Sequence, residues 1–365
     1  MVKEVLHLKN VLWSKKDGFF LESEVEDADL YLNKYTVASD TTSAWQFRPV
    51  AQKTIDNPVI VMDTLHSCFV HAIIDGIFSA YMLKKQIIEE ERCLDNFALF
   101  VRKEDILEYP EQNLKNIDKE GSVYSGVYGE MIKVVTKESI YFEHLLDDSE
   151  VFLFKDVYVT KLKKENHRSL WNSSLYYPGR YEGDVIFGDD ILQRMLNLFL
   201  EDVLNSYGLE KKDREFKKNI IIVDRKTDYR SFRKTWLHAT EEVDKNENNT
   251  LLDSLDNILI EQPCLHYKGI VYLEDMSLKE QIECFQNNDI IITPHGANMV
   301  HSLWTSNKII VEVIYDDSTL PMYKRVCSFT NNKLAQLTPY NIEQFVIMLC
   351  KRFKPLEPDV EVTEI

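Results

Sequence analysis

Residues 289–317 read DIIITPHGANMVHSLWTSNKIIVEVIYDD, and this stretch predicts a strand, a sharp polar turn, a helix and a second strand. Residues 290–293 are all β-branched, as expected of a parallel strand that is buried on both faces. Residues 309–314 form a second apolar run in which Glu312 is the only charge. The order strand, helix, strand is the βαβ unit from which nucleotide-binding α/β domains are built.

The polar turn of this unit, residues 294–298, has the composition of an anion-binding site. Gly296 and Ala297 are small enough for a ligand to approach the backbone, and the first helical turn offers unpaired N–H groups at the positive end of the helix dipole. Glu312, near the end of the next strand, is placed to accept hydrogen bonds from sugar or ribose hydroxyls. The alternative interpretation is ordinary turn chemistry, because every α/β domain contains βαβ units and neither the GxGxxG nor the P-loop fingerprint is present.

Strands and helices alternate along most of the chain, which favours two doubly wound α/β domains. With 365 residues the chain also exceeds a comfortable single core. We place the first domain at residues 1–212 and the second at 213–340, with a charged linker over 207–218 that has a helix-ending glycine near its start. The sequence leaves open that the last helix, within residues 340–355, packs back on the first domain.

The first half begins with an irregular segment to about residue 53. Strands are predicted after it at 59–62, 97–101 and 150–159, and helices are predicted at 66–91 and 190–206. In the second half, strands precede the βαβ unit at 219–223, 258–261 and 269–273, and helices are predicted at 234–242, after Ser277 and at 342–352. Ser277 and Glu280 fit a capping box, in which each side chain bonds the other residue's backbone N–H.

Composition restricts the classes of function. The net charge of −17 argues against nucleic acid or an anionic membrane surface as a partner, since phosphate groups require a basic surface. The six cysteines have no CxxC spacing, which disfavours a zinc site and is typical of thiols in a reducing compartment. We find no apolar run long enough for a membrane span and no signal-peptide pattern, so a cytoplasmic location is expected, as in a bacterial or virus-encoded enzyme.

Three segments, in this order, resemble motifs of glycosyltransferase family 61. Residues 71–75, HAIID, look like the family's H-x-x-x-D element, which also follows a strand. Residues 220–233 resemble its strand and arginine-rich loop, and the tetrapeptide TDYR within them is similar to that of the EGF-domain O-linked N-acetylglucosamine transferases. Residues 273–304 look like the C-terminal signature, in which a helix leads to a strand and an HGAGLTN-type turn. The resemblance covers roughly residues 57–315, and Asn298 stands where the family usually has a second glycine.

The resemblance implies a GT-B architecture, in which two Rossmann-like domains face each other across a cleft. It also implies an inverting transfer of a sugar from a UDP-sugar to a hydroxyl of a glycan or glycoprotein, with xylose or N-acetylglucosamine as the favoured sugar. We expect no cofactor besides the UDP-sugar co-substrate and no metal ion, since GT-B sites use arginines and helix dipoles where GT-A enzymes hold a metal with a DxD motif. The acidic pairs 189–190 and 316–317 and the segment 253–256 lack that spacing.

Sugar transfer needs a base for the acceptor hydroxyl and positive charge for the departing diphosphate. Asp75 is the expected base, and His71, four residues earlier on the same helical face, is expected to orient Asp75 or the acceptor. Guanidinium forks suit diphosphate oxygens, and the expected donor-binding residues are Arg225, Arg230, His295, Gly296, Ala297, Asn298 and Glu312. The alternative is a plain helix-surface pair for the first two residues and a solvated basic loop for the arginines.

Three other functions are compatible with these patterns. A non-catalytic nucleotide-sugar-binding protein would bind the donor without transferring the sugar. A nucleotide-sugar epimerase of GT-B-like architecture would convert the donor without any acceptor. An interaction scaffold is disfavoured by the three motifs in their common order.

Overall fold

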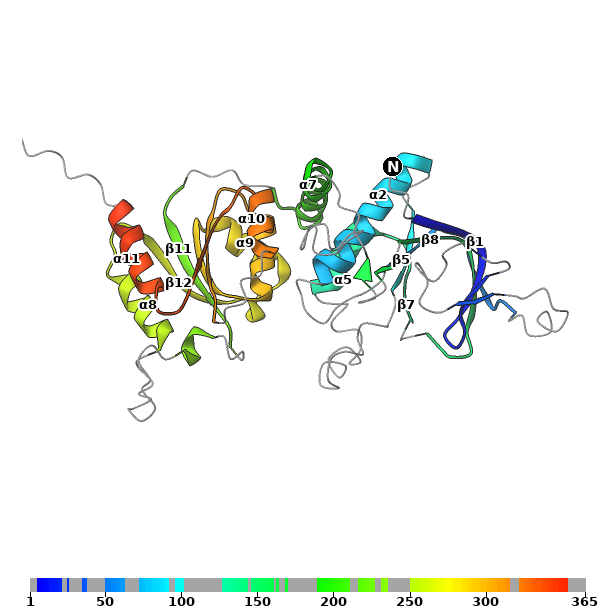
Figure 1. The fold of residues 1–365 in the computed structure, drawn as a ribbon, viewed down its shortest axis with the longest axis horizontal. Helices are drawn as coiled ribbons and strands as arrows, with labels where there is room; N and C mark the ends of the chain where they lie inside the picture. Colours follow the sequence, from blue (N-terminus) through cyan, green and yellow to red (C-terminus); the bar gives the residue numbers. More distant parts are fainter. Residues whose placement is uncertain are drawn as a thin grey trace, which may run out of the picture. The chain divides into compact units, whose positions relative to one another are not determined.

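The structure of the protein is a computed structural model, shown in Figure 1. It describes residues 5–21, 25, 35–37, 50–62, 72–91, 96–101, 127–143, 146–160, 162–163, 168–169, 189–210, 216–226, 231–235, 250–315 and 322–353. The chain divides into two compact units, Met1–Ser206 and Tyr207–Ile365. Each unit is α/β, as predicted, and each has a sheet of its own. The functional division predicted for residues 1–212 and 213–340 stays a prediction.

Unit 1 contains a mixed and mostly parallel sheet of strand order β3-β2-β1-β8-β5-β6-β7, with β4 paired to β8. Only the pairs of β1 with β2 and with β8 are antiparallel. The strands are β1 (Val5–Ser14), β2 (Gly18–Leu21), β3 (Tyr35–Val37), β4 (Lys53–Ile55), β5 (Val59–Met62), β6 (Ala98–Val101), β7 (Ile140–Phe142) and β8 (Val151–Thr160). A separate small ladder joins β9 (Leu162–Lys163) and β10 (Arg168–Ser169).

The irregular start predicted for unit 1 is wrong, because β1 to β3 occupy part of it. Lys9 and Asn10 are exposed in the middle of β1, and Asn10 has a positive φ of 52°, so the polar and apolar residues do not alternate regularly. The strand is nonetheless stabilised by burial of Trp13, whose ring meets Phe100 edge-on at a centroid distance of 4.9 Å. A local pattern search misses such a strand, since its partner β8 lies far away in the sequence.

Among the residues described in unit 1, the helices are a π-helical turn, η3 (Ala72–Phe78), and α2 (Ser79–Glu91), α5 (Val127–Val135) and α7 (Asp189–Ser206). The predicted helix at 190–206 is confirmed by α7. The predicted helix at 66–91 is confirmed from residue 72 onward, and residues 63–71 lie outside the described residues. Phe199 of α7 packs against Phe78 and Tyr81, which joins α7 to the η3–α2 segment.

Unit 2 contains a five-stranded, all-parallel sheet of order β12-β11-β13-β14-β15. Its strands are β11 (Asn219–Asp224), β12 (His266–Tyr272), β13 (Ile290–Pro294), β14 (Ile309–Val313) and β15 (Lys333–Leu337). The chain first adds β12 on one side of β11 and then β13 on the other. In an open parallel sheet, ligands bind at such a reversal, next to the carboxyl ends of the two strands that flank it.

Helices cover both faces of this sheet: Figure 1 shows α8 and α11 on one face and α9 and α10 on the other. Their bounds are α8 (Leu251–Ile260), α9 (Leu278–Asn287), α10 (Met322–Phe329) and α11 (Ile342–Phe353). The capping box predicted at the start of α9 is present, with Ser277 and Glu280 bonded to each other's backbone. The described part of the unit also contains three 3-10 segments: η6 (Phe232–Lys234), η7 (Leu273–Asp275) and η8 (Ala297–Trp304).

Two elements of unit 2 differ from the sequence prediction. Residues 258–261, predicted as a strand, form the end of α8 and its cap, because Leu255 and Leu259 continue a buried helical stripe that starts at Leu251. The predicted helix of the βαβ unit is the 3-10 segment η8. The helix predicted at 234–242 lies outside the described residues beyond Thr235.

The last helix, α11, packs against α8 within unit 2. Packing of residues 340–355 on the first domain, which the sequence left open, stays a prediction. Ile342, Val346, Leu349 and Cys350 are buried in one cluster with the apolar face of α8. Among the residues that the structure describes, no helix is both long and apolar enough to span a membrane.

Candidate functional site

The carboxyl ends of β11 and β13 lie side by side at the reversal of strand order in unit 2. Ile222 pairs with Ile292, two residues before β11 ends and two before β13 ends. Arg225 follows β11 directly, and His295 and Gly296 follow β13 directly. The sheet therefore brings together the arginine loop and the polar turn that the sequence singled out separately.

Arg225 and Gly296 are in close contact. A Cβ atom added to Gly296 would lie 2.0 Å from Nη2 of Arg225 and 2.8 Å from its Cζ, so the guanidinium occupies the space above the glycine Cα. Gly296 also has φ 145° and ψ −162°, a conformation that is almost restricted to glycine. The backbone conformation thus requires glycine at this position, and a side chain here would displace the guanidinium of Arg225.

Asp224, the last residue of β11, holds the arginine loop in place. Its side chain is fully buried and accepts hydrogen bonds from Ser231 Oγ at 3.0 Å and from the backbone N–H of Phe232 at 2.8 Å. These bonds tie the far end of the loop back to the strand from which it leaves. Arg230 lies in the part of this loop outside the described residues.

His295, Glu312 and Gln336 form a chain of side-chain hydrogen bonds across three neighbouring strand ends. His295 Nδ1 lies 2.6 Å from Glu312 Oε1, and Gln336 Nε2 donates to Glu312 Oε2 at 2.9 Å. Because the carboxylate can only accept, Nδ1 carries the proton, and Nε2 is left to accept as neutral imidazole or to donate as imidazolium. The side chain of His295 is 15% exposed and that of Glu312 is 0% exposed.

This geometry changes the interpretation of Glu312. The sequence suggested that its carboxylate accepts bonds from sugar or ribose hydroxyls. In the structure both of its oxygens already have partners, and no part of the side chain reaches solvent. The arrangement favours a role for Glu312 in orienting His295. A carboxylate bonded to one ring nitrogen of a histidine commonly fixes the orientation and the tautomer of the ring.

The turn itself is supported from α10. The buried Tyr323 donates its hydroxyl hydrogen to the carbonyl of Gly296 at 2.7 Å, and its ring meets that of His295 edge-on at 5.7 Å. Ala297 and Asn298 are partly buried at the start of η8. The Nδ2 atom of Asn298 is buried and has no hydrogen-bond partner among the described residues, so a donor remains beside the turn.

The expected base, Asp75, lies in the π-helical turn η3 of unit 1, and its side chain is outside the described part of the structure. Ser79 Oγ donates to the carbonyl of Ile74, five residues earlier, at 3.4 Å. Turns of this kind are rare and recur at functional sites. His71 lies outside the described residues, and the meeting of Asp75 with the site in unit 2 stays a prediction.

Within the described residues, no group of three or more histidine, cysteine or acidic side chains could hold a metal ion. The family model described as Glycosyltransferase 61 matches residues 257–311, from α8 to β14. The resemblance inferred from the sequence is confirmed over this segment, which contains the C-terminal signature. This family implies glycosyltransferase activity, and such activity requires a sugar donor and an acceptor.

No curated protein matches the chain. One solved structure that aligns with it is a flavo di-iron protein mutant from Thermotoga maritima. The alignment has 11% identity and a TM-score of 0.28, and it covers 75% of this chain and 85% of that chain. A likeness of this size carries no argument about fold or function.

Three residues that hold the site were not singled out from the sequence: Asp224, Tyr323 and Gln336. All three lie outside the segment that matches the glycosyltransferase 61 family. Asp224 had a local signal, since it is a carboxylate at the end of a buried apolar strand. Tyr323 and Gln336 had none, because their partners are set by the packing of α10 and by the position of β15.

Proposed function

We propose that the chain is an inverting glycosyltransferase of the GT-B type, in which the two α/β units face each other across a cleft. It moves a sugar, with xylose or N-acetylglucosamine favoured, from a UDP-sugar to a hydroxyl of a glycan or glycoprotein. The contact of Arg225 with Gly296 at the strand-order reversal supports this most, since it places a cation where ligands bind in such sheets.

In this proposal the donor diphosphate lies beside Gly296, between Arg225 and His295. A guanidinium donates two parallel N–H bonds to phosphate oxygens, and the missing Cβ of Gly296 gives the guanidinium of Arg225 room to lie against the turn. The buried amide of Asn298 supplies a further donor. Arg230, on the loop that Asp224 anchors, would add a second cation.

His295 acts on the leaving group in the same proposal. As an imidazolium it donates from Nε2 to the departing diphosphate, while Glu312 balances its charge from the other side of the ring. Gln336 keeps the carboxylate in position. Donors held in place before the reaction stabilise charge that develops in the transition state, which is where catalysis gains most.

Asp75 completes the reaction as general base. It takes the proton of the acceptor hydroxyl while that oxygen attacks the anomeric carbon from the face opposite the diphosphate. The bond from the anomeric carbon to the β-phosphate oxygen breaks, and its electron pair leaves with UDP. A single displacement of this kind inverts the configuration of the sugar.

The proposal needs no metal ion, since Arg225, Arg230 and His295 supply the positive charge. One tripeptide of DxD spacing does occur in the sequence, Asp27-Ala28-Asp29, and it lies in unit 1 outside the described residues. Turnover in excess chelator separates the two mechanisms. Full activity is expected, and its loss with recovery on adding a divalent cation would assign the reaction to a metal-dependent site.

The donor is tested by thermal unfolding with a panel of UDP-sugars, because a ligand that binds only the folded state raises the melting temperature. UDP-xylose or UDP-N-acetylglucosamine should give the largest shift, and Arg225→Ala should abolish it. Lys226→Ala is the matched control, since this neighbouring cation is exposed and pairs with Asp275 at 2.6 Å.

Turnover is measured separately, as UDP release and as labelled product. Asp75→Asn should retain the thermal shift and lose transfer. A full shift without transfer to any glycan acceptor in the unmodified protein would indicate a binding protein, and conversion of the donor sugar without an acceptor would indicate an epimerase. If Lys226→Ala loses the thermal shift as fully as Arg225→Ala does, the assignment of Arg225 to the donor site is wrong.

A further inference from the structure

A cavity lies in unit 2, where the strands begin rather than where they end. It has a volume of about 430 Å³. Its walls come from the segment that leads into β11, the turns that lead into β14 and β15, and the end of α11. They include Phe216, Asn307, Asn331, Lys333, Arg352 and Phe353. The volume falls within the usual range of pockets for small molecules, roughly 300–1,000 Å³.

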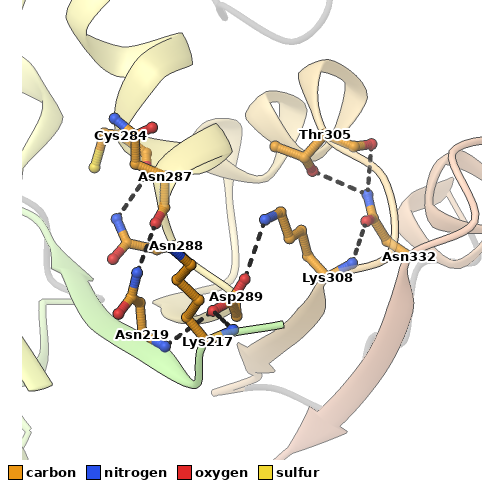
Figure 2. A network of polar contacts seen from close by, with 9 residues as sticks. All are labelled: Lys217, Asn219, Cys284, Asn287, Asn288, Asp289, Thr305, Lys308 and Asn332. Carbon is orange, nitrogen blue, oxygen red and sulfur yellow. Dashed lines mark hydrogen bonds and ion pairs between the residues drawn. The ribbon is translucent and has the colours of Figure 1, made fainter. Parts of the chain in front are cut away.

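The charged groups of this cavity are all basic. Lys308, Lys333 and Arg352 line it, and no acidic side chain does so among the described residues. Lys308 is neutralised by Asp289, whose carboxylate lies 3.3 Å from its Nζ, as Figure 2 shows. Lys333 and Arg352 are exposed and form no ion pair or hydrogen bond through their side chains with the described residues. Within the described part of the chain, these two cations have no compensating carboxylate in the cavity, although the chain has 60 acidic and 43 basic residues.

The remaining wall is apolar. Phe216 and Phe353 pack with ring centroids 5.5 Å apart and their planes tilted by 33°, and Leu349 and Ile309 line the cavity beside them. Aromatic faces bury large areas of a ligand at little cost in conformational entropy. The cavity therefore offers an apolar surface to the body of a ligand and cations to its charged end.

The polar rim is held by a hydrogen-bond network, part of which is drawn in Figure 2. Asn332 accepts from the backbone N–H of Lys308 at 2.9 Å and donates to Thr305, so the turns before β14 and β15 are bonded together. Asn331 Nδ2 donates to Asn307 Oδ1 at 3.0 Å across the same two turns. A rim fixed in this way loses little freedom when a ligand binds, which favours affinity.

The cavity is separate from the candidate donor site. It lies at the amino ends of β14 and β15, whereas His295 and Glu312 lie at the carboxyl ends of β13 and β14. A strand of five residues separates the two ends by roughly 15 Å at about 3.3 Å per residue. One UDP-sugar in the donor site cannot fill both.

We propose that this cavity binds a small organic anion, an oxyanion joined to a flat apolar body, independently of the sugar donor. Lys333 and Arg352 bind the oxyanion, and the phenylalanine pair packs against the apolar body. The occupant is thus a regulatory or accessory ligand of unit 2 and differs from the substrates of the proposed transfer reaction.

The probe is naphthyl phosphate, with naphthol and inorganic phosphate as its two halves, measured by titration calorimetry on the full chain. Naphthyl phosphate should bind at least about tenfold more tightly than either half, since only the intact probe uses both walls. Hydrogen exchange locates the site: protection is expected at residues 331–333 and 350–353 and not at 294–298. Saturating UDP should leave this binding unchanged.

Charge reversal supplies the sharpest comparison. Arg352→Glu and Lys333→Glu should each weaken binding of naphthyl phosphate by about tenfold, because a nearby cation becomes an anion. Lys351→Glu is the matched control: it makes the same change in net charge on the adjacent, exposed residue of α11, which does not line the cavity. All three positions are at the surface, so the variants are expected to fold.

Several results would overturn this inference: equal binding of naphthol and naphthyl phosphate, equal weakening by the control variant, displacement by UDP, or protection confined to the donor turn. Residues 354–365 follow Phe353, lie outside the described residues and carry four acidic side chains. Binding seen only after their removal would also overturn it, since the chain itself would then fill the cavity. Failure of UDP-sugars to bind leaves the inference untouched, because the two sites are measured with different ligands.

Discussion

Replacing Gly296 with alanine should weaken binding of UDP and destabilise unit 2 at the same time. The new Cβ would lie 2.0 Å from Nη2 of Arg225, so the guanidinium has to move by more than about 1 Å to reach ordinary contact distance. A charge-assisted hydrogen bond does not survive such a shift, and its loss costs about 1.5–3 kcal/mol. UDP should therefore bind roughly 10- to 150-fold more weakly.

The same substitution strains the backbone. At φ 145° an alanine costs about 1–3 kcal/mol, and the clash with Arg225 adds to this. Gly269→Ala is the matched control, because Gly269 has φ 96° in the same unit and nothing lies within 4 Å of its added Cβ. The control should lose stability through backbone strain alone and should bind UDP like the unmodified protein.

A double-mutant cycle with Arg225→Ala separates the two contributions. Removing the guanidinium relieves the clash, so the double variant should be more stable than the sum of the single effects predicts. Denaturant titrations give the stabilities and calorimetry with UDP gives the affinities. If Gly296→Ala binds UDP normally, or if its effect on stability is simply additive with that of Arg225→Ala, the proposed contact of the guanidinium with both glycine and diphosphate is refuted.

Two further predictions concern stability. Burial lowers the pKa of His301 from 6.5 to about 3. Between these two pH values the imidazole is protonated in the unfolded chain and neutral in the folded chain. The free energy of unfolding should therefore fall by up to about 1.4 kcal/mol per pH unit on acidification. Denaturant titrations between roughly pH 6 and 4 should show a smaller slope for His301→Gln, and equal slopes would contradict the buried neutral imidazole. Lys308→Met should cost about 3–5 kcal/mol, because it leaves the buried carboxylate of Asp289 without its cation. Lys226→Met, which breaks an exposed ion pair with Asp275, should change stability by less than about 1 kcal/mol, and similar losses in both variants would argue against the buried pair.

The elements that sequence patterns predicted best are those whose signals are local. The β-branched runs of β11 and β13 and the capping box of α9 depend on residues within one element. The strand predicted at residues 258–261 is wrong for a related reason. A short apolar run fits both a strand and the end of a helix, and only burial of the stripe from Leu251 to Leu259 decides between them. The prediction of an irregular start to unit 1 is wrong because the alternation of polar and apolar residues in β1 is interrupted at Asn10.

The candidate site was predicted in part, because some of its residues have local sequence signals and others do not. Glycine after a buried strand and arginine after another are local signals, so Gly296 and Arg225 could be named in advance. The role expected for Glu312 was incomplete, because Gln336 and His295 take both of its oxygens only when β13, β14 and β15 lie in register. The site's base remains a prediction, since the side chain of Asp75 lies outside the described part of the chain.

The sequence by itself determined the α/β class, most strands of the second sheet and the resemblance that the family match confirmed. Tertiary structure alone decided that Arg225 covers Gly296, that Glu312 faces His295, and that a cavity opens at the other end of the sheet. The physical reason is that the periodicity of apolar residues and the residue preferences of turns are local signals, which extend over a few residues and predict single elements. Contacts between strand ends depend on strand order and register, which are set by the burial of the whole sheet between its helices.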